Sequence, residues 1–370
     1  MTTHVPNDIY PAPASPYYIV APHYIRTSAG IRVLHLLCHS LNRRGQAAYI
    51  ILIGEPNHGG SFCLDLSTPV LTLDALMEHY RRGLAPVMVY PETISGNPFR
   101  SPCVVRYILN FPGLLGGEKD YSSEELCFSY SKILAKATRS PENVLYLPPI
   151  DTRTFHPPAS EQKRSGSCFY AGKYKAIHKG KLFDVTRQSV EITRDLPTSQ
   201  TPQEIAELFR RSEVFYTYEN TALATEAVLC GCPAVFLPNP YLTHIIAEEE
   251  LGIDGYAWGD DPDQIMRAKA TVQQGAESYR KSTAKYWHEL DRFIELSQEH
   301  ARARQYTRPV DILNVANAAD RKNAISQSSS ASLTRETIRE IAREVWYEKQ
   351  RWGLPYKVGK WLTMRSQNND

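Results

Sequence analysis

The stretch YENTALATEAVLCGCPAVF (218–236) holds the end of one strand, a turn, a helix and the start of the next strand. The residues before it, VFYT, are apolar, aromatic or β-branched, as in a buried strand. Thr221 suits a helix N-cap, Gly231 marks where that helix ends, and Pro233 opens the apolar segment PAVFLP. A strand, a helix and a strand with short links predict a parallel crossover unit.

The same alternation runs outward in both directions. Thr201, Pro202 and Glu204 predict a capped helix before this unit, and Asp261 with Pro262 predicts another helix after it. In the first half, Val33, Leu36, Leu37 and Leu41 recur at helical spacing. Further helices are expected near 73–83 and 122–130, and strands at 17–22, 47–54, 85–91, 103–110, 144–149 and 167–173. We therefore predict an α/β protein with two Rossmann-like, doubly wound domains facing a cleft.

The polar, proline-containing segment DTRTFHPPASEQKRSG (151–166) is the expected domain boundary. A last amphipathic helix with a basic and aromatic end either meets a membrane surface or packs back on the N-terminal domain. The predicted division is a flexible arm (1–15), an N-terminal acceptor domain (16–155), a C-terminal nucleotide-sugar domain (160–315), a low-complexity linker (319–332) and the C-terminal helix and tail (333–370).

Composition restricts the partners and the compartment. A formal net charge of +2 over 370 residues is too small for a protein that coats nucleic acid. Seven scattered cysteines, mostly in apolar runs, predict free thiols in a reducing compartment. The chain shows neither a secretory signal nor an apolar run long enough to span a membrane. We expect a cytoplasmic protein, with peripheral contact at the inner face of the membrane through the tail as an option.

The turn at 219–221 is a candidate phosphate site, because the helix that begins there presents unpaired N–H groups and the positive end of its dipole. Glu219 and Asn220 lie in this turn. Glu226 lies in an otherwise apolar helix, where its carboxylate needs a partner such as the hydroxyls of a ribose. The alternative is that both glutamates are surface carboxylates, stabilised by the helix start.

The run 218–236 resembles the signature of GT-B glycosyltransferases, especially the large retaining group with two glutamates before a Gly-Xaa-Pro turn. Glu226, Ala227, Gly231 and Pro233 carry the match. Six residues separate Glu219 from Glu226, whereas the group usually has seven.

Two more segments carry the resemblance. YAGKYKAIHKGK (170–181) is similar to the strand, glycine and basic turn of the group, with one extra residue and lysine where arginine is common. The resemblance implies that Lys173 and Lys179 hold the phosphates of the donor; the alternative is a solvated basic loop. PPIDTRTFHP (148–157) resembles the interdomain segment of the same group.

The N-terminal half offers weaker candidates. Gly30 in TSAGIRV (27–33) fits the glycine turn near the donor, but the fuller dinucleotide fingerprint is missing, which argues against a nicotinamide dehydrogenase. Glu92 and Asn97 follow a strand end and are candidate acceptor contacts or parts of a structural turn. Neither metal-ligand histidine spacing nor an Asp-Xaa-Asp motif occurs, so we expect no metal and no cofactor.

Taken together, the resemblance implies transfer of a sugar from a nucleotide-sugar donor to a glycan or lipid-linked glycan, with retention, in cell-surface polysaccharide synthesis. Glu219 and Lys179 are the catalytic candidates, and the donor is expected to contact Gly30, Lys173, Lys179, Glu219, Asn220, Thr221 and Glu226. Two alternatives stay open. One is an inverting transferase or nucleotide-sugar epimerase with Glu92 or a histidine as base; the other is a non-catalytic sugar-binding or scaffold protein of a glycan-assembly complex.

Overall fold

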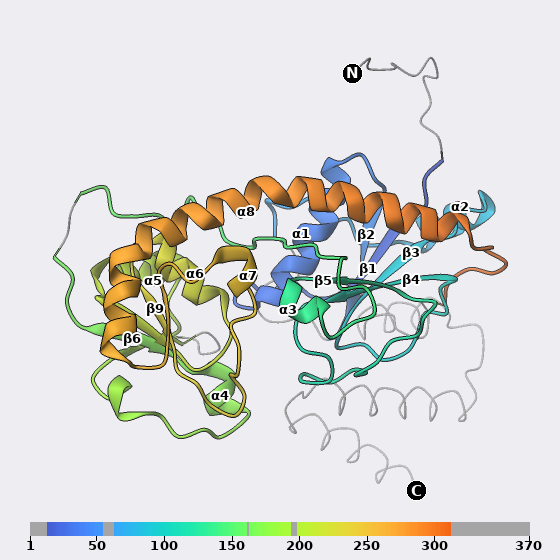
Figure 1. Cartoon of the computed structure of the whole chain (residues 1–370). Coiled ribbons are helices and arrows are strands. Elements are labelled where there is room, and N and C mark those ends of the chain that lie inside the picture. Colours follow the sequence, from blue (N-terminus) through green and yellow to red (C-terminus); the bar gives the residue numbers. More distant parts are fainter. Residues whose placement is uncertain (1–12, 55–62, 161–162, 194–197, 312–370) are drawn as a thin grey trace, which may run out of the picture.

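The computed structural model describes residues 13–54, 63–160, 163–193 and 198–311 (Figure 1). The predicted linker (319–332), the C-terminal helix and tail (333–370) and most of the N-terminal arm lie outside the described residues.

In the first half of the described chain, five parallel strands form one sheet in the order β2-β1-β3-β4-β5. Strand β1 aligns Tyr18 with Tyr49 of β2 on one side and with Met88 of β3 on the other. The strands are β1 (Tyr17–Pro22), β2 (Ala48–Ile53), β3 (Val87–Pro91), β4 (Cys103–Ile108) and β5 (Leu126–Ser129), and the helices are α1 (Ala29–Arg43), α2 (Leu73–Arg81) and α3 (Lys132–Ala135).

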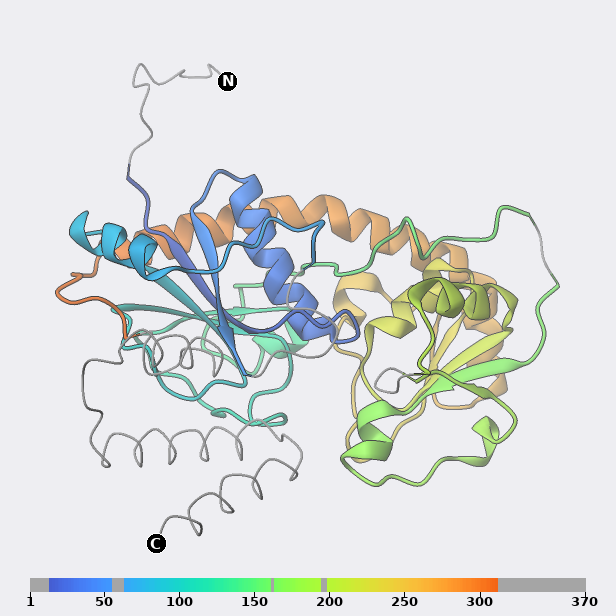
Figure 2. The same ribbon diagram turned by 180° about the vertical axis from the view of Figure 1, so that it is seen from behind.

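Helix α1 covers one face of this sheet (Figure 2). Ser28 caps its N-terminus by accepting a hydrogen bond from the Ile31 N–H. Val33, Leu37 and Leu41 point into the core against β1 and β2, as their helical spacing predicts. Strand β1 lies between β2 and β3, and its residues 17–21 are buried whichever face of the sheet they point to, which explains why the strand lacks charged residues.

The second half repeats the same topology, and its described residues form a parallel sheet in the order β10-β9-β8-β6-β7. Its strands are β6 (Ser167–Tyr170), β7 (Val190–Glu191), β8 (Val214–Thr217), β9 (Ala234–Phe236) and β10 (Tyr256–Trp258). Its helices are α4 (Gly172–Ala176), the 3-10 turn η1 (Asp184–Thr186), α5 (Pro202–Arg211), α6 (Ala222–Leu229), α7 (Glu248–Leu251) and α8 (Pro262–Arg302). The predicted α/β architecture of two doubly wound domains is confirmed.

The predicted helix ends in this half are confirmed as well. Thr201 and Glu204 form a reciprocal capping box at the start of α5. Thr221 caps α6, and Gly231 takes the left-handed backbone conformation (φ 76°) just beyond its end. Asp261 caps α8, whose first residue is Pro262.

Two expectations in the first half were wrong. The segment 122–130, predicted as a helix, contains the edge strand β5, and 144–149, predicted as a strand, contributes only an isolated pairing of Val144 with Ser129. The apolar part of each segment, LCF (126–128) and VLYL (144–147), is too short for periodicity to separate a strand from a helix. Residues 126–129 form a strand because they pair in parallel with β4, where Val105 to Ile108 lie beside Leu126 to Ser129.

Helix α8, with 41 residues, crosses from the second sheet to the first (Figure 1). Ala276 and Tyr279 in its first half belong to the core of the second sheet. Leu290 and Phe293 in its second half belong to the core of the first sheet. The predicted range 160–315 therefore includes a helix whose second half packs on the N-terminal sheet. No local sequence pattern predicts this arrangement.

Gly275 allows α8 to approach the second sheet closely. A Cβ at this position would lie 2.1 Å from the backbone oxygen of Asp254 in the loop before β10. Although α8 is long, charged residues interrupt it throughout, and no helix within the described ranges is both long and apolar enough to cross a membrane.

Replacing Phe293 by alanine tests whether α8 stabilises the first sheet. Phe293 is fully buried (0% exposed), with its ring centroid 4.8 Å from that of Phe128 and 6.0 Å from that of Tyr17. We expect Phe293→Ala to lower the free energy of unfolding by about 3–5 kcal/mol, measured by urea denaturation. Arg280→Ala, on an exposed position of the same helix, is the control and should change it by less than about 0.5 kcal/mol. Equal effects of the two changes would contradict the bridging role of α8.

Candidate active site between the two sheets

A cavity of about 190 Å³ lies between the two sheets. From the first sheet, the loop after β4 contributes Asn110, Phe111, Leu114 and Leu115. From the second sheet, the turns after β6, β8 and β9 contribute the opposite wall. In the order β10-β9-β8-β6-β7 the direction of winding reverses between β6 and β8, and ligands of such sheets bind at that point, beyond the strand carboxyl ends.

Glu219 and Lys173 meet at this switch point. The backbone N–H of Lys173, in the first turn of α4, donates a hydrogen bond of 2.8 Å to the Glu219 carboxylate. Both residues line the cavity, and the Lys173 side chain is exposed there. The structure therefore brings together two of the predicted donor contacts from turns 46 residues apart in the chain.

Lys179 lies differently. Its ammonium donates to the carbonyl of Ala176 (2.7 Å), and its backbone has a left-handed φ of 55°. It is not among the residues that line the cavity within the described part of the chain. In this structure Lys179 closes the end of the turn after α4.

Asn220 and Thr221 shape the turn after β8. The Asn220 amide donates to the carbonyl of His244 (2.9 Å) and accepts from the N–H of Ile246 (3.0 Å), so it ties this turn to the loop after β9. Thr221 accepts from the Leu223 N–H as the cap of α6. Their side chains position the loops around the cavity.

Aromatic rings form much of the wall on the second sheet, and sequence reasoning missed them. His178 and Tyr241 stack with centroids 3.7 Å apart, and Tyr174 stacks on Tyr218 at 5.0 Å. They come from three separate turns, so only the folded chain gathers them. Flat rings of this kind suit the faces of a nucleobase or a sugar.

Glu226 is buried and is paired with a residue that the sequence did not single out. Its carboxylate lies 3.1 Å from the guanidinium of Arg32 in α1, and the two side chains are 3% and 11% exposed. This ion pair joins the two halves of the molecule. In the structure, the carboxylate predicted to bind a ribose is thus engaged by the opposite domain.

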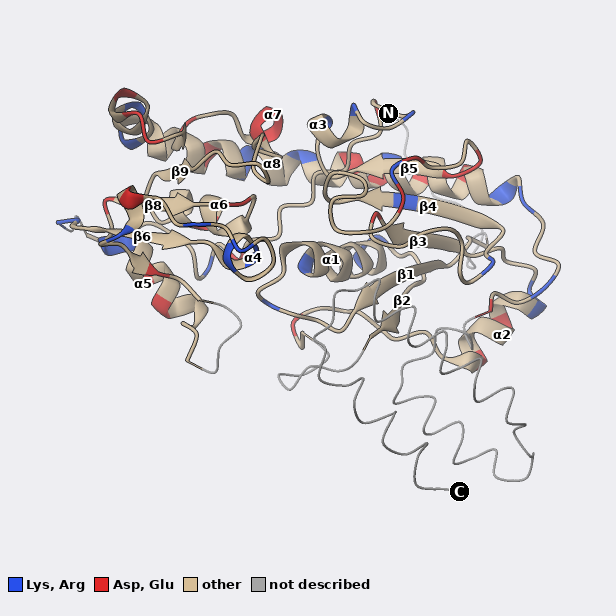
Figure 3. Ribbon diagram, turned by 90° about the horizontal axis from the view of Figure 1, so that it is seen from below, with Lys and Arg blue, Asp and Glu red and all other residues tan. Residues whose placement is uncertain are grey.

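The acidic helix α7 makes a second contact between the halves, beside α3 (Figure 3). The backbone N–H of Lys132 donates to Glu250 (2.8 Å), and the Lys136 ammonium pairs with Glu249 (2.5 Å). These two contacts join α3 of the first half to α7 of the second.

Glu92 follows β3 and is buried (3% exposed). Burial raises the pKa of its carboxyl to about 7, partly offset by the hydrogen bond from the Leu109 N–H (2.9 Å) and by the positive charge of Lys173. The effect of Lys173 places Glu92 within electrostatic reach of the second sheet. Burial also raises the pKa of Tyr121, and the nearby Glu92 carboxylate raises it further.

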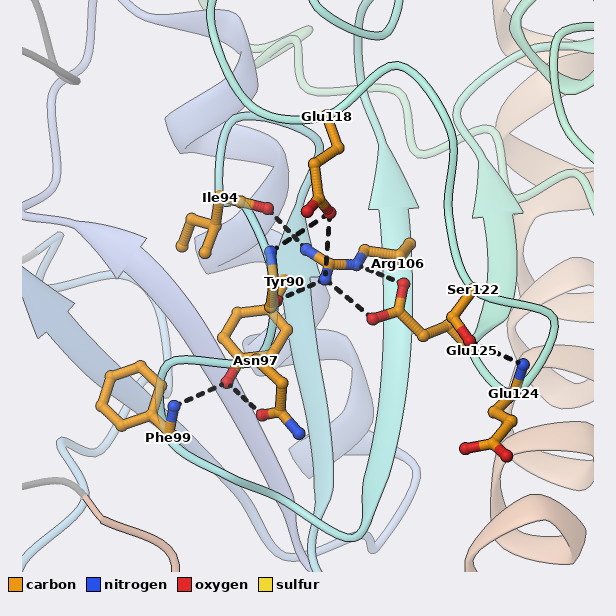
Figure 4. Close-up of polar contacts among 10 residues, drawn as sticks. Tyr90, Ile94, Asn97, Phe99, Arg106, Glu118, Ser122, Glu124 and Glu125 are labelled. Atoms are coloured by element: carbon orange, nitrogen blue, oxygen red, sulfur yellow. Dashed lines mark hydrogen bonds and ion pairs between the residues drawn. The ribbon is translucent and has the colours of Figure 1, made fainter.

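Arg106 in β4 organises the loops around Glu92 (Figure 4). Its side chain is fully buried (0% exposed) and forms a forked ion pair with Glu125 at 2.8 and 2.9 Å. It also donates to the carbonyls of Ile94 and Gly96 in the loop that follows β3. Sequence reasoning missed Arg106, because its hydrogen-bond acceptors lie in other loops and are known only from the folded structure.

Asn97, a predicted acceptor contact, lies in that same loop. Its amide accepts from the Tyr90 hydroxyl (3.0 Å; Figure 4). It also exchanges two hydrogen bonds with the backbone of Ser101. These bonds build the turn, so Asn97 lies in the structure as part of a structural turn, the role that the sequence offered as the alternative to an acceptor contact. Gly30, a predicted donor contact, lies in the first turn of α1, where a Cβ would touch Leu109 at 3.7 Å.

His23 directly follows β1, beside the strand that precedes Glu92. It is 5% exposed, and within the described ranges neither ring nitrogen has a hydrogen-bond partner. Buried polar groups are usually satisfied, so two unpaired nitrogens at a sheet's switch point call for a ligand or a water. In the same ranges, no group of His, Cys, Asp and Glu side chains could hold a metal ion.

Comparison with known proteins gives distant likenesses in structure alone. No family model matches the chain, and no curated protein matches it. Solved structures similar to it include the glycosyltransferase SnogD from Streptomyces nogalater (11% identity, TM-score 0.42, 77% of this chain and 100% of that one). An O-GlcNAc transferase mutant from Thermobaculum terrenum (12%, 0.42, 79% and 71%) is similar too, as is WaaG, a glycosyltransferase involved in lipopolysaccharide biosynthesis (12%, 0.38, 84% and 99%).

These likenesses are too weak to carry an argument. The fold is shown by this chain's own two sheets.

The raised pKa of Glu92 predicts a pH-dependent stability. The folded state holds this proton up to about pH 7, whereas the unfolded state releases it near 4.5. Stability is therefore fully present below about pH 4.5 and falls as the pH rises to about 7, by roughly 3 kcal/mol in all. Glu92→Gln, which keeps an acceptor for the Leu109 N–H, should remove this loss. Urea unfolding of the wild type and of Glu92→Gln at pH 5 and pH 8 measures this loss. An equal change in the free energy of unfolding between the two pH values in both proteins would refute the raised pKa of Glu92.

Proposed function

We propose that this chain is a glycosyltransferase of the GT-B type, which moves a sugar from a nucleotide-sugar donor to a glycan or lipid-linked glycan acceptor. The observation that carries the proposal is the pairing of Glu219 with the Lys173 N–H in a cavity at the switch point of the second sheet, closed on its other side by the first sheet. A nucleotide-sugar offers phosphates, hydroxyls and an aromatic base, and each has a chemical counterpart there.

On this proposal the donor lies against the second sheet. Its phosphates meet the N-terminus of α6 and the ammonium of Lys173, which neutralise the charge that develops on the leaving phosphate. Glu219, oriented by the Lys173 N–H, accepts hydrogen bonds from sugar hydroxyls. Lys179 remains a proposed phosphate contact, and to act so its ammonium must leave the Ala176 carbonyl.

The acceptor would lie against the first sheet, near Glu92. Positioning of two substrates in one cavity supplies much of the catalysis, since neither then has to find the other in solution. The resemblance in the second half of the sequence supports retention of the anomeric configuration and a role in cell-surface polysaccharide synthesis. A cytoplasmic location, with contact at the inner face of the membrane through the tail, belongs to the same proposal.

Lys173→Ala and Glu219→Gln test the donor site. Each should lower the rate of sugar transfer or donor hydrolysis on the order of 10²-fold, because each removes one interaction with the phosphate or sugar. Lys175→Ala is the matched control, since Lys175 lies in the same helix but pairs with Glu191 (2.5 Å).

A panel of nucleotides in a thermal unfolding assay identifies the donor class beforehand, since a bound ligand raises the melting temperature. A flat response across the panel, with no transfer by the wild type, would favour the non-catalytic scaffold alternative.

An inverting transferase is the second candidate, favoured by His23 and Glu92 at the carboxyl ends of neighbouring strands β1 and β3. Inversion needs a general base for the acceptor hydroxyl, and a group with a pKa near 7 suits that role. If this candidate holds, His23→Ala or Glu92→Gln lowers kcat by about 10²–10⁴-fold, and NMR shows a product of inverted anomeric configuration. A product of retained configuration rules it out.

A further inference from the structure

A second cavity, of about 410 Å³, lies in the first half of the molecule and shares no lining residue with the cavity between the sheets in the described part of the chain. It is formed by the end of the loop between β4 and β5 and by the turn after α3, two segments that flank β5 in the chain. Its volume lies within the range of small-molecule sites, roughly 300–1,000 Å³. Of its 12 lining residues, 5 are charged and 4 are serine or threonine, so a polar ligand suits it best.

The charged residues of this second cavity leave an excess of positive charge. The Lys136 ammonium is paired with Glu249 of α7 (2.5 Å), and the Glu125 carboxylate is paired with Arg106. Among the residues that the structure describes, three charged side chains of the lining then remain without an ion pair: Lys119, Arg139 and Asp120. Two cations and one carboxylate are therefore available to a ligand.

Arg139 is the cation best suited to hold an acidic group. Its side chain is exposed, and its guanidinium has no acceptor within the described ranges. A guanidinium can donate two parallel hydrogen bonds to a carboxylate or a phosphate. Its charge also reaches the cavity wall, since burial raises the pKa of the Cys127 thiol to about 11 and the positive charge of Arg139 opposes that rise.

Serine hydroxyls supply the neutral part of the lining. Ser122 accepts a hydrogen bond from the Glu124 N–H (3.2 Å) and keeps its own hydrogen to donate. The hydroxyls of Ser123 and Ser140 have no partner in the described part of the chain. Each hydroxyl both donates and accepts, as the hydroxyls of a sugar do, whereas a bare anion needs donors alone. The lining therefore matches a sugar that carries an acidic group better than it matches free phosphate.

Tyr121 connects this cavity with the proposed acceptor position near Glu92. It lines the cavity, and its raised pKa comes first from burial and next from the charge of Glu92. Its ring packs against the guanidinium of Arg106 (5.4 Å to the ring centroid), which holds the loop after β3. Its side chain thus reaches from the cavity to the surroundings of Glu92.

We propose that this cavity binds an anionic sugar of the acceptor glycan, one that carries a carboxylate or a phosphate group. Arg139 and Lys119 contact the acidic group, and the serine hydroxyls contact the hydroxyls of the sugar. A neighbouring sugar of the same glycan then lies near Glu92. The role of the ligand as acceptor rests on the proposed function, whereas its binding can be measured without any transfer.

Saturation-transfer NMR on the full chain, with glucuronate, glucose 6-phosphate and glucose as ligands, tests the proposal. At least one of the two acidic sugars should bind about tenfold more tightly than glucose, because it adds charge-assisted hydrogen bonds. Arg139→Gln should remove this tenfold preference and leave the affinity for glucose unchanged. Lys132→Gln is the matched control, since Lys132 is an exposed cation of α3 that does not line this cavity, and it should keep the preference.

Ser123→Trp is a second variant, which places a large ring in the cavity from an exposed position. It should abolish the binding of all three sugars, and unchanged binding would show that they bind elsewhere and overturn the proposal. The proposal is also wrong if neither acidic sugar binds more tightly than glucose, or if the preference survives in Arg139→Gln. Inorganic phosphate, added at the same concentration, should displace the acidic sugar only in part. Complete displacement would reveal an anion site without sugar recognition, which contradicts the proposal.

Failure of this site and failure of the proposed function give different results. A chain that transfers sugar but binds neither acidic sugar contradicts this site alone. A chain that binds an acidic sugar, yet binds no nucleotide and transfers no sugar, contradicts the proposed function and confirms the sugar site.

Discussion

Helix α8 is the constraint on which the rest of the molecule depends. Its first half completes the core of the second sheet and its second half completes the core of the first. A single continuous helix therefore holds the two sheets side by side, and the cavity between their loops follows from that placement. Buried aromatic contacts such as that of Phe293 with Phe128 make the junction part of a core, in contrast to the wetter interfaces usual between domains.

Within the frame that α8 provides, polar groups set the details of the cavity. The turns at the ends of the sheets are held by side chains that bond to backbone, as Asn97 and Asn220 do from within the turns and Arg106 does from strand β4. Such bonds hold the loops, since loop backbone groups would otherwise be unsatisfied. Within the described ranges, the charged side chains Lys173 and Glu219 line the cavity, and Glu92 lies within electrostatic reach of Lys173.

The second sheet was largely predictable because its helix ends carry local chemistry. Thr201 with Glu204, Thr221, Gly231 and Asp261 act on backbone groups within a few residues, so their effect does not depend on the rest of the fold. Of the predicted site residues, the structure brings Glu219 and Lys173 together. Glu219 was singled out because it lies between a strand end and a helix start, and Lys173 because its segment resembles the basic turn of a known family. The stacked pair His178 and Tyr241 was not, since nothing in the sequence indicates that two distant turns meet.

The sequence by itself determined the alternation of strands and helices, and hence two doubly wound sheets with polar turns at their carboxyl ends, because turn and cap chemistry is local. The tertiary structure alone decided the partners of buried charges. Arg32 and Glu226 lie 194 positions apart, and Arg106 gathers acceptors from two separate loops. A buried charge takes whichever opposite charge the packing brings within about 3 Å, and that depends on how the sheets are joined, which no local pattern encodes.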